Sequence, residues 1–491
     1  MKLRYLLAAT VGLFSQSAWA QSIKSVSPYH YYVEIGGGAA TSSQTPFWLR
    51  TNQYGVVPLE SNFGTARVGS SREYRVDSTR KSTFDWGFGV LGVANFTENQ
   101  YKILAPDLFI KAKWGKFELF AGNRREIVGL GDSTLTSGFV AWSGNAMTFP
   151  KIQLQTVDYI PLKFLKNILA FKASYTHGWF TAPYIQGVYL HQKTFYARFG
   201  KPHWSARFYA GLNHQVQWGG KADYLKGTLL AQNGQLPSTF RDYISLITGR
   251  YPDDLINDRY TIFDGSNRIG NHLGSYDFAL EWRRTTHTIL LYHQHLYEDA
   301  SGLAFQNFPD GLTGLSISRR NKKPNKSLSI TKLTIEHLST LNQSGAVFDP
   351  TAQYQGTDNY FNHGQYKEGW SYQNQTLGSP FIAPLTTLKP EVQEKFKGFF
   401  FPNNQVKVWY LGSVWQFGHR LNITTRSSFS RNFGSFSYFY APALQQFSHS
   451  LAAQIILPKI TGFTFSASAA LDHGTLFPDA FGGFISVKKQ W

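Results

Sequence analysis

The stretch from residue 204 to residue 217 reads WSARFYAGLNHQVQ, and its side chains alternate between an apolar and a polar series. The apolar series runs from Trp204 through Phe208 to Val216, and the polar series between them includes Arg207 and Asn213. Because successive side chains of a strand point to opposite faces, this alternation predicts a strand with one apolar and one polar face. A strand that faces lipid outside and water inside needs this division, although a soluble sandwich also shows it.

The same period of two recurs along the chain, for example from Leu421 to Arg426 and from Phe463 to Leu471. A further segment near 29–37 is either an additional strand or a periplasmic arm. The expected strands, about eighteen in number, cover residues 45–53, 64–75, 83–95, 105–114, 117–125, 151–160, 168–177, 186–199, 204–218, 275–284, 286–298, 312–320, 327–340, 405–416, 419–431, 444–457, 462–471 and 481–491.

The connections between these segments alternate in length. Long connections are expected near 126–150, 219–274 and 341–404, and tight turns such as 113–117 and 200–203 fall between them. Every long connection then lies at one end of the strands, and both chain ends lie at the other end, as an even strand count requires. The sequence therefore predicts an all-β fold, a transmembrane antiparallel β-barrel of about 18 strands with short periplasmic turns and long extracellular loops.

Residues 1–20 have the layout of a secretory signal peptide. Lys2 and Arg4 precede a short apolar run, and Ala18 and Ala20 give a small-x-small cleavage site. The apolar run is shorter than the roughly 20 residues of a membrane-spanning helix. We expect residues 21–44 to form an N-terminal periplasmic arm or extra strand, and residues 45–491 to form a barrel in the outer membrane of a Gram-negative bacterium.

Composition supports this class of protein. Aromatic residues make up 16% of the chain, and charged residues also make up only 16%, against about 25% in soluble domains. The absence of cysteine excludes a disulfide framework and a lipoprotein anchor. The final segment ends on an aromatic residue, Trp491, which resembles the recognition signal of the barrel-assembly machinery. We therefore expect that machinery as a partner during biogenesis and outer-membrane lipid as a partner afterwards.

The formal net charge of +18 leaves two interpretations open. The basic residues could face acidic polysaccharide or phosphate-rich surfaces outside the cell, or they could lie in turns and in the lumen. Nucleic acid is not expected as a partner of an exported protein. No catalytic motif occurs, and His293 and His295 are too few ligands for a metal site, so no catalytic residue, metal or cofactor is expected.

The long loops are the candidates for function. Residues 341–404 interleave aromatic side chains with amides and carboxylates, a composition that can stack on sugar rings and bind their hydroxyl groups. The alternative is that this loop folds inward and plugs the barrel. Residues 240–274 carry several arginines, which suit carboxylates or phosphates of an acidic glycan, or else internal salt bridges.

Several blocks of the chain form a recognisable set, namely TPFWLRTNQYG at 45–55, GNRREIVGL at 122–130, WSGNA at 142–146 with PKI at 150–152, DY through ITGR at 242–250, DNYFN at 358–362, GWSY at 369–372 and LGSP at 377–380. In their order and spacing, these blocks resemble the capsule assembly Wzi family in its Bacteroidetes-type branch. The resemblance implies an outer-membrane barrel with a lectin-like role, no catalysis and no cofactor. At Asn123 the chain departs from the small or basic residue expected there.

These observations lead to one principal functional hypothesis. We expect a surface lectin that binds exported capsular or extracellular polysaccharide and helps assemble or anchor it. A passive porin or oligosaccharide channel is the alternative, and an outer-membrane hydrolase lacks the paired side chains that it would need. The candidate polysaccharide-binding residues are Arg124, Arg125, Arg250, Tyr251, Asn359, Tyr360, Trp370 and Tyr372.

Overall fold

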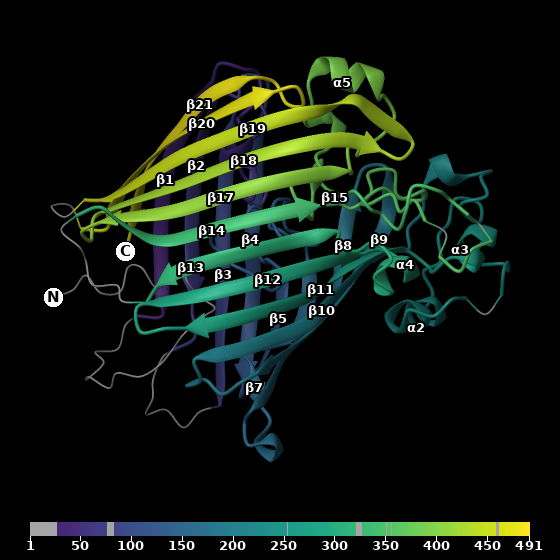
Figure 1. Ribbon diagram of the computed structural model, residues 1–491, viewed down its shortest axis with the longest axis horizontal. Coiled ribbons are helices and arrows are strands. Elements are labelled where there is room, and N and C mark those ends of the chain that lie inside the picture. Colours follow the sequence, from purple (N-terminus) through teal and green to yellow (C-terminus); the bar gives the residue numbers. More distant parts are fainter. Residues whose placement is uncertain are drawn as a thin grey trace.

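The computed structural model describes residues 27–75, 83–252, 254–320, 327–349, 351–354, 356–457 and 461–491. The expected signal peptide lies outside these residues. In the described part of the chain, no helix is long and apolar enough to cross a membrane. Figure 1 shows a cylinder of long strands with the C-terminus at one end and most of the helices at the other.

The strands form one closed antiparallel sheet. Each strand pairs with its sequence neighbours, and the first strand also pairs with the last, which closes the barrel. The two-residue strand β7 continues the line of β6 along β8, so the barrel has eighteen strands around its wall. The strands are β1 Tyr29–Ala40, β2 Phe63–Arg72, β3 Phe84–Phe96, β4 Tyr101–Trp114, β5 Phe117–Asn123, β6 Lys151–Thr156, β7 Ile160–Pro161, β8 Leu169–Ala182, β9 Ile185–Phe199, β10 Ala206–Trp218, β11 Asn271–Arg283, β12 His287–Tyr297, β13 Gly311–Arg319, β14 Ser329–Ser339, β17 Val406–Phe417, β18 Leu421–Ser435, β19 Tyr438–Ile456, β20 Phe463–Gly474 and β21 Ala480–Gln490.

The remaining elements are short and lie in the connections. Among the described residues, only the 3-10 helix η1 lies at the end of the barrel with the short turns, and the other elements lie in connections at the opposite end. They are α1 Phe47–Arg50, η1 Lys163–Leu165, η2 Asp223–Leu225, α2 Phe240–Thr248, α3 Ile262–Ser266, α4 Ala300–Leu303, the hairpin of β15 Ser371–Tyr372 and β16 Gln375–Thr376, η3 Leu385–Thr387 and α5 Pro390–Lys395.

The expected strand at 45–53 is wrong. Its centre forms the short helix α1, and Phe47 and Trp48 are both buried. Two adjacent apolar side chains on one side do not fit a strand of alternating faces, and Pro46 has no backbone N–H for a ladder. The first strand of the wall is instead β1, which covers the segment near 29–37, so the strand count and the side of every long loop are unchanged.

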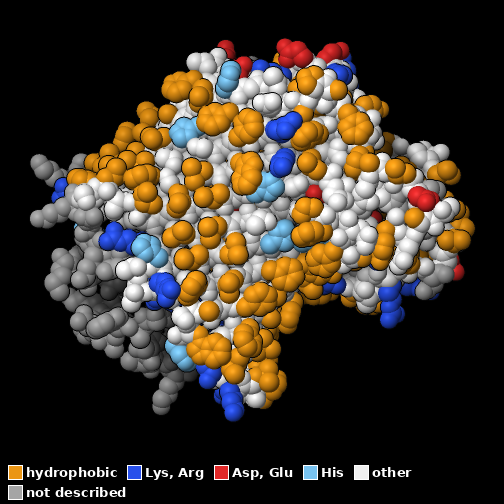
Figure 2. All heavy atoms as spheres, viewed as in Figure 1, with side chains coloured by type: hydrophobic (Ala, Val, Ile, Leu, Met, Phe, Trp, Pro, Cys, Tyr) orange, Lys and Arg blue, Asp and Glu red, His pale blue; other side chains and the backbone are white. Residues whose placement is uncertain are grey.

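The alternation predicted for the wall is confirmed. On β10, Phe208 is exposed on the outside of the barrel, whereas Arg207 and Asn213 are buried on the inside. On β1, Val33 and Ile35 are exposed in the same way. Hydrophobic side chains cover much of the outer face of the strands in Figure 2. This apolar outer surface is what a wall in contact with lipid requires.

Three long connections fold into the barrel. Apolar side chains from residues 45–57, 127–149 and 360–401 form one buried cluster together with inward-facing side chains of the strands, among them Tyr292 and Tyr410. We call these three segments the plug. Because the plug packs against inward-facing side chains of the strands, the wall and the loops share a single core.

Candidate functional site

Hydrogen bonds fix the plug to the wall around the barrel. Polar side chains that point inward from seven strands accept from, or donate to, the plug. The pairs are Asp472 Oδ2 with Phe47 N at 2.7 Å, Ser428 Oγ with Trp48 Nε1 at 3.1 Å, the Tyr410 hydroxyl with Leu135 O at 2.7 Å, Glu336 Oε2 with Ser137 N at 2.6 Å, Gln294 Oε1 with Val140 N at 3.0 Å, Asp277 Oδ2 with Leu130 N at 3.0 Å, and Asn95 Nδ2 with Val56 O at 2.8 Å.

Glu336 makes the densest of these connections. Its carboxylate accepts hydrogen bonds from the Thr136 hydroxyl at 2.7 Å, from the Ser137 backbone N–H and from the Tyr292 hydroxyl. The residue is only 1% exposed. Since a buried carboxylate is tolerated only when its oxygens are satisfied, this arrangement ties the loop after β5 to the far wall of the barrel.

The centre of the plug is aromatic. Trp370 is fully buried, its Nε1 donates to Ala141 O at 2.9 Å, and its ring packs edge-on against Trp142. Tyr372 packs against Phe149 with ring centroids 5.0 Å apart, and its hydroxyl lies 2.7 Å from Thr181 Oγ1 on β8. The plug thus joins the loop at 341–404 to the loop at 126–150 and to the wall.

Three of the predicted binding residues therefore lie inside the protein. Trp370 and Tyr372 belong to the aromatic centre, and Tyr360 is fully buried, accepting from Asn307 Nδ2 at 2.6 Å and donating to Asp310 Oδ2 at 3.1 Å. A buried ring offers no face to a sugar, so in this conformation the three side chains hold the plug. This part of the loop at 341–404 therefore folds inward and plugs the barrel, as the alternative interpretation of its sequence expected.

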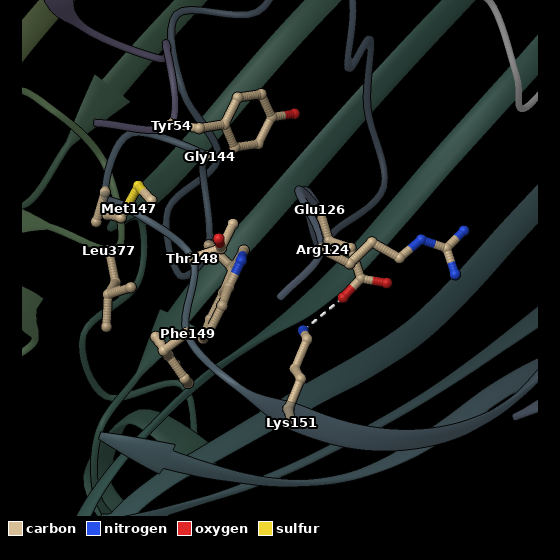
Figure 3. Close-up of a pocket in the computed structure, with 11 residues that line it drawn as sticks. Tyr54, Arg124, Glu126, Gly144, Met147, Thr148, Phe149, Lys151 and Leu377 are labelled. Carbon is tan, nitrogen blue, oxygen red and sulfur yellow. Dashed lines mark ion pairs between the residues drawn. The ribbon is translucent and has the colours of Figure 1, made fainter. Parts of the chain in front are cut away.

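Arg124 and Arg125 face the lumen. Arg124 donates to Glu118 Oε1 at 2.6 Å and lies over the ring of Phe120. Arg125 pairs with Asp107, with Nη2 2.7 Å from Oδ2. Figure 3 shows Arg124 beside a small cavity next to the ion pair of Glu126 with Lys151 on β6.

The other three predicted residues lie at the surface of the loops. Asn359 is exposed, and its amide oxygen accepts from Asn362 Nδ2 at 3.0 Å. Arg250 and Tyr251 follow α2 and are both exposed. The guanidinium of Arg268 lies 4.9 Å from the centre of the Tyr251 ring. The eight predicted residues thus fall into separate groups rather than into one site.

A surface at the tip of the β8–β9 hairpin was not predicted. The rings of Tyr184 and Tyr224 lie 6.1 Å apart, and Lys367 Nζ is 5.1 Å and 5.3 Å from their centres. An open cleft of about 470 Å³ lies next to Tyr184, lined by residues 180–183 and 185–187. Aromatic faces beside a cation and a cleft suit a sugar that carries negative charge. The three residues come from three loops, so no local pattern could reveal them.

Buried acids stabilise the loop layer in their protonated form. Burial raises the pKa of Asp264 to about 7, although Gln365 donates to both of its carboxylate oxygens at 3.0 Å. Burial also raises the pKa of Asp358 to about 7, with Asp299 adding to the effect. The pKa of Glu298 is raised well above its ordinary value by burial.

The packing of the loop layer should consequently weaken as pH rises. A carboxyl whose pKa is raised in the folded state stabilises that state below its ordinary pKa near 3.8, and the contribution is lost as pH rises to about 7. After correction for intrinsic rates, amide hydrogen exchange of residues 356–368 should show stronger protection at pH 5 than at pH 8. Asp264→Asn should reduce this difference, and equal protection at both pH values would contradict the assignment.

In the described part of the chain, no three His, Cys, Asp or Glu side chains gather in a way that could hold a metal ion.

Comparison with solved structures finds similar barrels. Wzi from Escherichia coli, described as an outer membrane protein involved in group 1 capsule assembly and as a carbohydrate-binding β-barrel, superposes with a TM-score of 0.56 at 13% identity, over 93% of this chain and 83% of that chain. OpdK from Pseudomonas aeruginosa gives a TM-score of 0.45 at 9% identity, over 94% of this chain and 98% of that chain.

Comparison of the sequence gives the family. No curated protein matches the chain. The family model of the capsule assembly protein Wzi matches residues 59–398, a range that includes plug residues 127–149 and 360–398 and most of the wall. This match covers well over half of the 491 residues. The chain therefore belongs to the Wzi family of capsule assembly proteins.

Proposed function

We propose that this protein binds exported capsular or extracellular polysaccharide at the loop end of the barrel and holds it at the cell surface. Family membership supports a role in capsule assembly, and the family's E. coli representative is described as carbohydrate-binding. The single observation that favours binding of polysaccharide over its passage through the lumen is the plug, which is hydrogen-bonded to seven strands of the wall. No catalysis enters this proposal.

The contact surface in this proposal lies at the surface of the loops, where Tyr224 and Lys367 are exposed and Tyr184 is half-buried. Tyr184, Tyr224 and Lys367 supply stacking faces and a positive charge next to the cleft. Arg250 and Tyr251 supply a second exposed pair of the same character. Stacking on a sugar ring and attraction to its carboxylates act together at such surfaces, and the attraction weakens in salt.

Replacing Tyr184 and Tyr224 together with alanine should weaken polysaccharide binding about tenfold or more, since aromatic contacts each contribute about 1 kcal/mol or more. The measurement is the affinity of the purified protein for the capsule of the producing cell. Tyr101→Ala is the matched control, because Tyr101 is 77% exposed at the tip of the β3–β4 hairpin and should leave the affinity unchanged. If the double alanine variant and Tyr101→Ala lost affinity equally, the polysaccharide would not contact the surface of Tyr184 and Tyr224.

Arg250→Ala with Tyr251→Ala belongs in the same assay as a separate arm. This pair should lower the affinity mainly at low salt, because it removes a charge as well as a ring. Substitutions at these exposed positions are preferable to removal of residues 341–404, since that loop also supplies the buried centre of the plug. Loss of binding after such a removal would not separate surface contact from a collapsed plug.

The remaining parts of the proposal concern where the protein acts. We propose that residues 1–20 direct export, that the barrel-assembly machinery inserts the chain, and that the long loops then face the exterior. Trp491 lies at the seam, where its N–H donates to Tyr31 O of β1 at 3.0 Å. The alternative of a passive porin requires an open path through the lumen, which the plug argues against.

A further inference from the structure

Helix α2 does not lie over the lumen. Leu246 on one side of the helix packs against Val216 and Trp218, which point outward from β10. The Tyr243 ring lies 5.3 Å from the Trp218 ring, and its hydroxyl is 2.7 Å from the hydroxyl of Tyr175 on β8. The helix therefore rests on the outer face of the barrel, the face that contacts lipid lower down.

The height of α2 on the wall is set by β9. On the outward side of that strand, Phe199 and Phe195 are exposed apolar residues, and the next outward residue is Lys193. Lys193 Nζ donates to Ile247 O at the end of α2. The helix thus covers the wall on the loop side of Phe195, near the rim of the barrel, where a membrane–water interface would meet it.

Next to the wall-facing side of α2, one flank of the helix is apolar and exposed. Phe240 is 78% exposed and Ile244 is 44% exposed, one helical turn apart, with the exposed Arg241 between them. Leu255 and Ile256, 65% and 62% exposed, are two further apolar residues in the segment after the helix. We call these five residues the α2 patch.

The turn that carries Leu255 and Ile256 is fixed to the start of the helix. Arg259 donates to the hydroxyl of Thr239, the N-cap residue, at 3.1 Å and forms an ion pair with Asp242. Thr239 and Asp242 also make a reciprocal capping box that holds the first turn of α2. The patch is therefore built on an ordered element.

The four apolar side chains of the α2 patch lack a cover among the described residues, and the helix rests on the outward face of β10, the same face on which Phe208 is exposed. Large apolar side chains that stay exposed to water lack the stabilisation that burial would give them. A helix at the interface with one apolar side and basic residues beside it is the pattern of elements that lie in the headgroup region of a membrane. Figure 1 shows α2 beside the loop ends of β9 and β10, at the edge of the barrel.

We propose that the α2 patch anchors the loop layer in the outer leaflet of the membrane. Phe240, Ile244, Leu255 and Ile256 enter the upper acyl-chain region, and Arg241 meets the phosphate groups of an anionic glycolipid such as lipid A. This contact fixes the height and tilt of the barrel and keeps the polysaccharide surface above the headgroups. It is independent of whether the loops bind polysaccharide.

The test uses the full mature protein in vesicles of phosphatidylcholine with and without lipid A, with a photoreactive group on the acyl chains. Peptides containing residues 240–256 should be labelled in the wild type. Phe240→Ser with Ile244→Ser should reduce that labelling about tenfold, and Phe240→Leu with Ile244→Leu should retain it, because only the apolar surface differs. Heat-dependent gel migration verifies that each variant has assembled its barrel.

The role of the positive charge of Arg241 is tested by the effect of lipid A on the labelling of residues 240–256. Lipid A should increase labelling of the wild type and of Arg241→Lys, but not of Arg241→Gln. Arg250→Gln, assigned above to the polysaccharide surface, is the matched control and should keep the response to lipid A while its polysaccharide affinity falls. Absence of labelling in the wild type, or protection of this segment by soluble polysaccharide instead of by vesicles, would overturn the proposal.

Discussion

Replacement of Glu336 by alanine is expected to release the loop after β5 from the wall and open the barrel to ions. The substitution leaves the Thr136 hydroxyl, the Ser137 N–H and the Tyr292 hydroxyl without their acceptor. Each unsatisfied buried donor costs about 1–3 kcal/mol, so the plug should lose about 4 kcal/mol of stability. Planar bilayers should register little conductance for the wild type and a steady or flickering current for the variant.

Two variants separate this effect from a general loss of lumen charge. Glu336→Gln keeps an acceptor for the Ser137 N–H and should show a smaller increase in conductance. Glu34→Ala removes a carboxylate from the wall of β1 whose ion-pair partner is Arg67 of β2, 3.8 Å away, and should leave the pore closed. A closed pore in Glu336→Ala would mean that the remaining wall contacts hold the plug without it.

Replacement of Trp370 by alanine is expected to disorganise the loop layer while the barrel stays assembled. Trp370 is fully buried, and its ring contacts Trp142 and Phe180 from two other parts of the chain. Tryptophan-to-alanine changes in a core cost about 3–5 kcal/mol. Local protection against hydrogen exchange in residues 360–401 should fall about a hundredfold or more, since each 1.4 kcal/mol is a factor of about ten.

The control for this variant is Trp114→Ala. Trp114 is 76% exposed at the opposite end of the barrel, so its removal should leave exchange in residues 360–401 unchanged. Heat-dependent gel migration should be similar for both variants, because neither residue contributes to the hydrogen-bond ladder of the wall through its side chain. If Trp370→Ala instead prevented barrel assembly, the plug would have to form before the wall closes.

The wall of this protein could be predicted from the sequence because its determinant is local. Phe208 and Arg207 lie side by side in the chain, and the period of two sends one to lipid and the other to the lumen. The strand count and the side of each long loop follow from the same rule. The one misplaced strand, 45–53, lies where adjacent apolar residues are buried on one side as α1.

The loops could not be predicted in the same way. An aromatic residue within a polar loop, such as Trp370, has the same local pattern whether it binds a sugar or fills a core, and its burial depends on Trp142 and Phe180. Glu336 resembles any inward polar residue of a strand until Ser137 of the plug reaches it. The surface made by Tyr184, Tyr224 and Lys367 likewise exists only after three loops meet.

The sequence by itself determined that the chain is a barrel of about eighteen strands with its long loops at one end, and it indicated the Wzi family. The tertiary structure alone decided that three loops plug the lumen, which of their aromatic residues remain exposed, and that α2 rests on the outer wall. The physical reason is the range of the interactions. Alternation is set by neighbouring residues, whereas the packing of a loop is set by partners that lie hundreds of residues away, as Phe47 and Asp472 do.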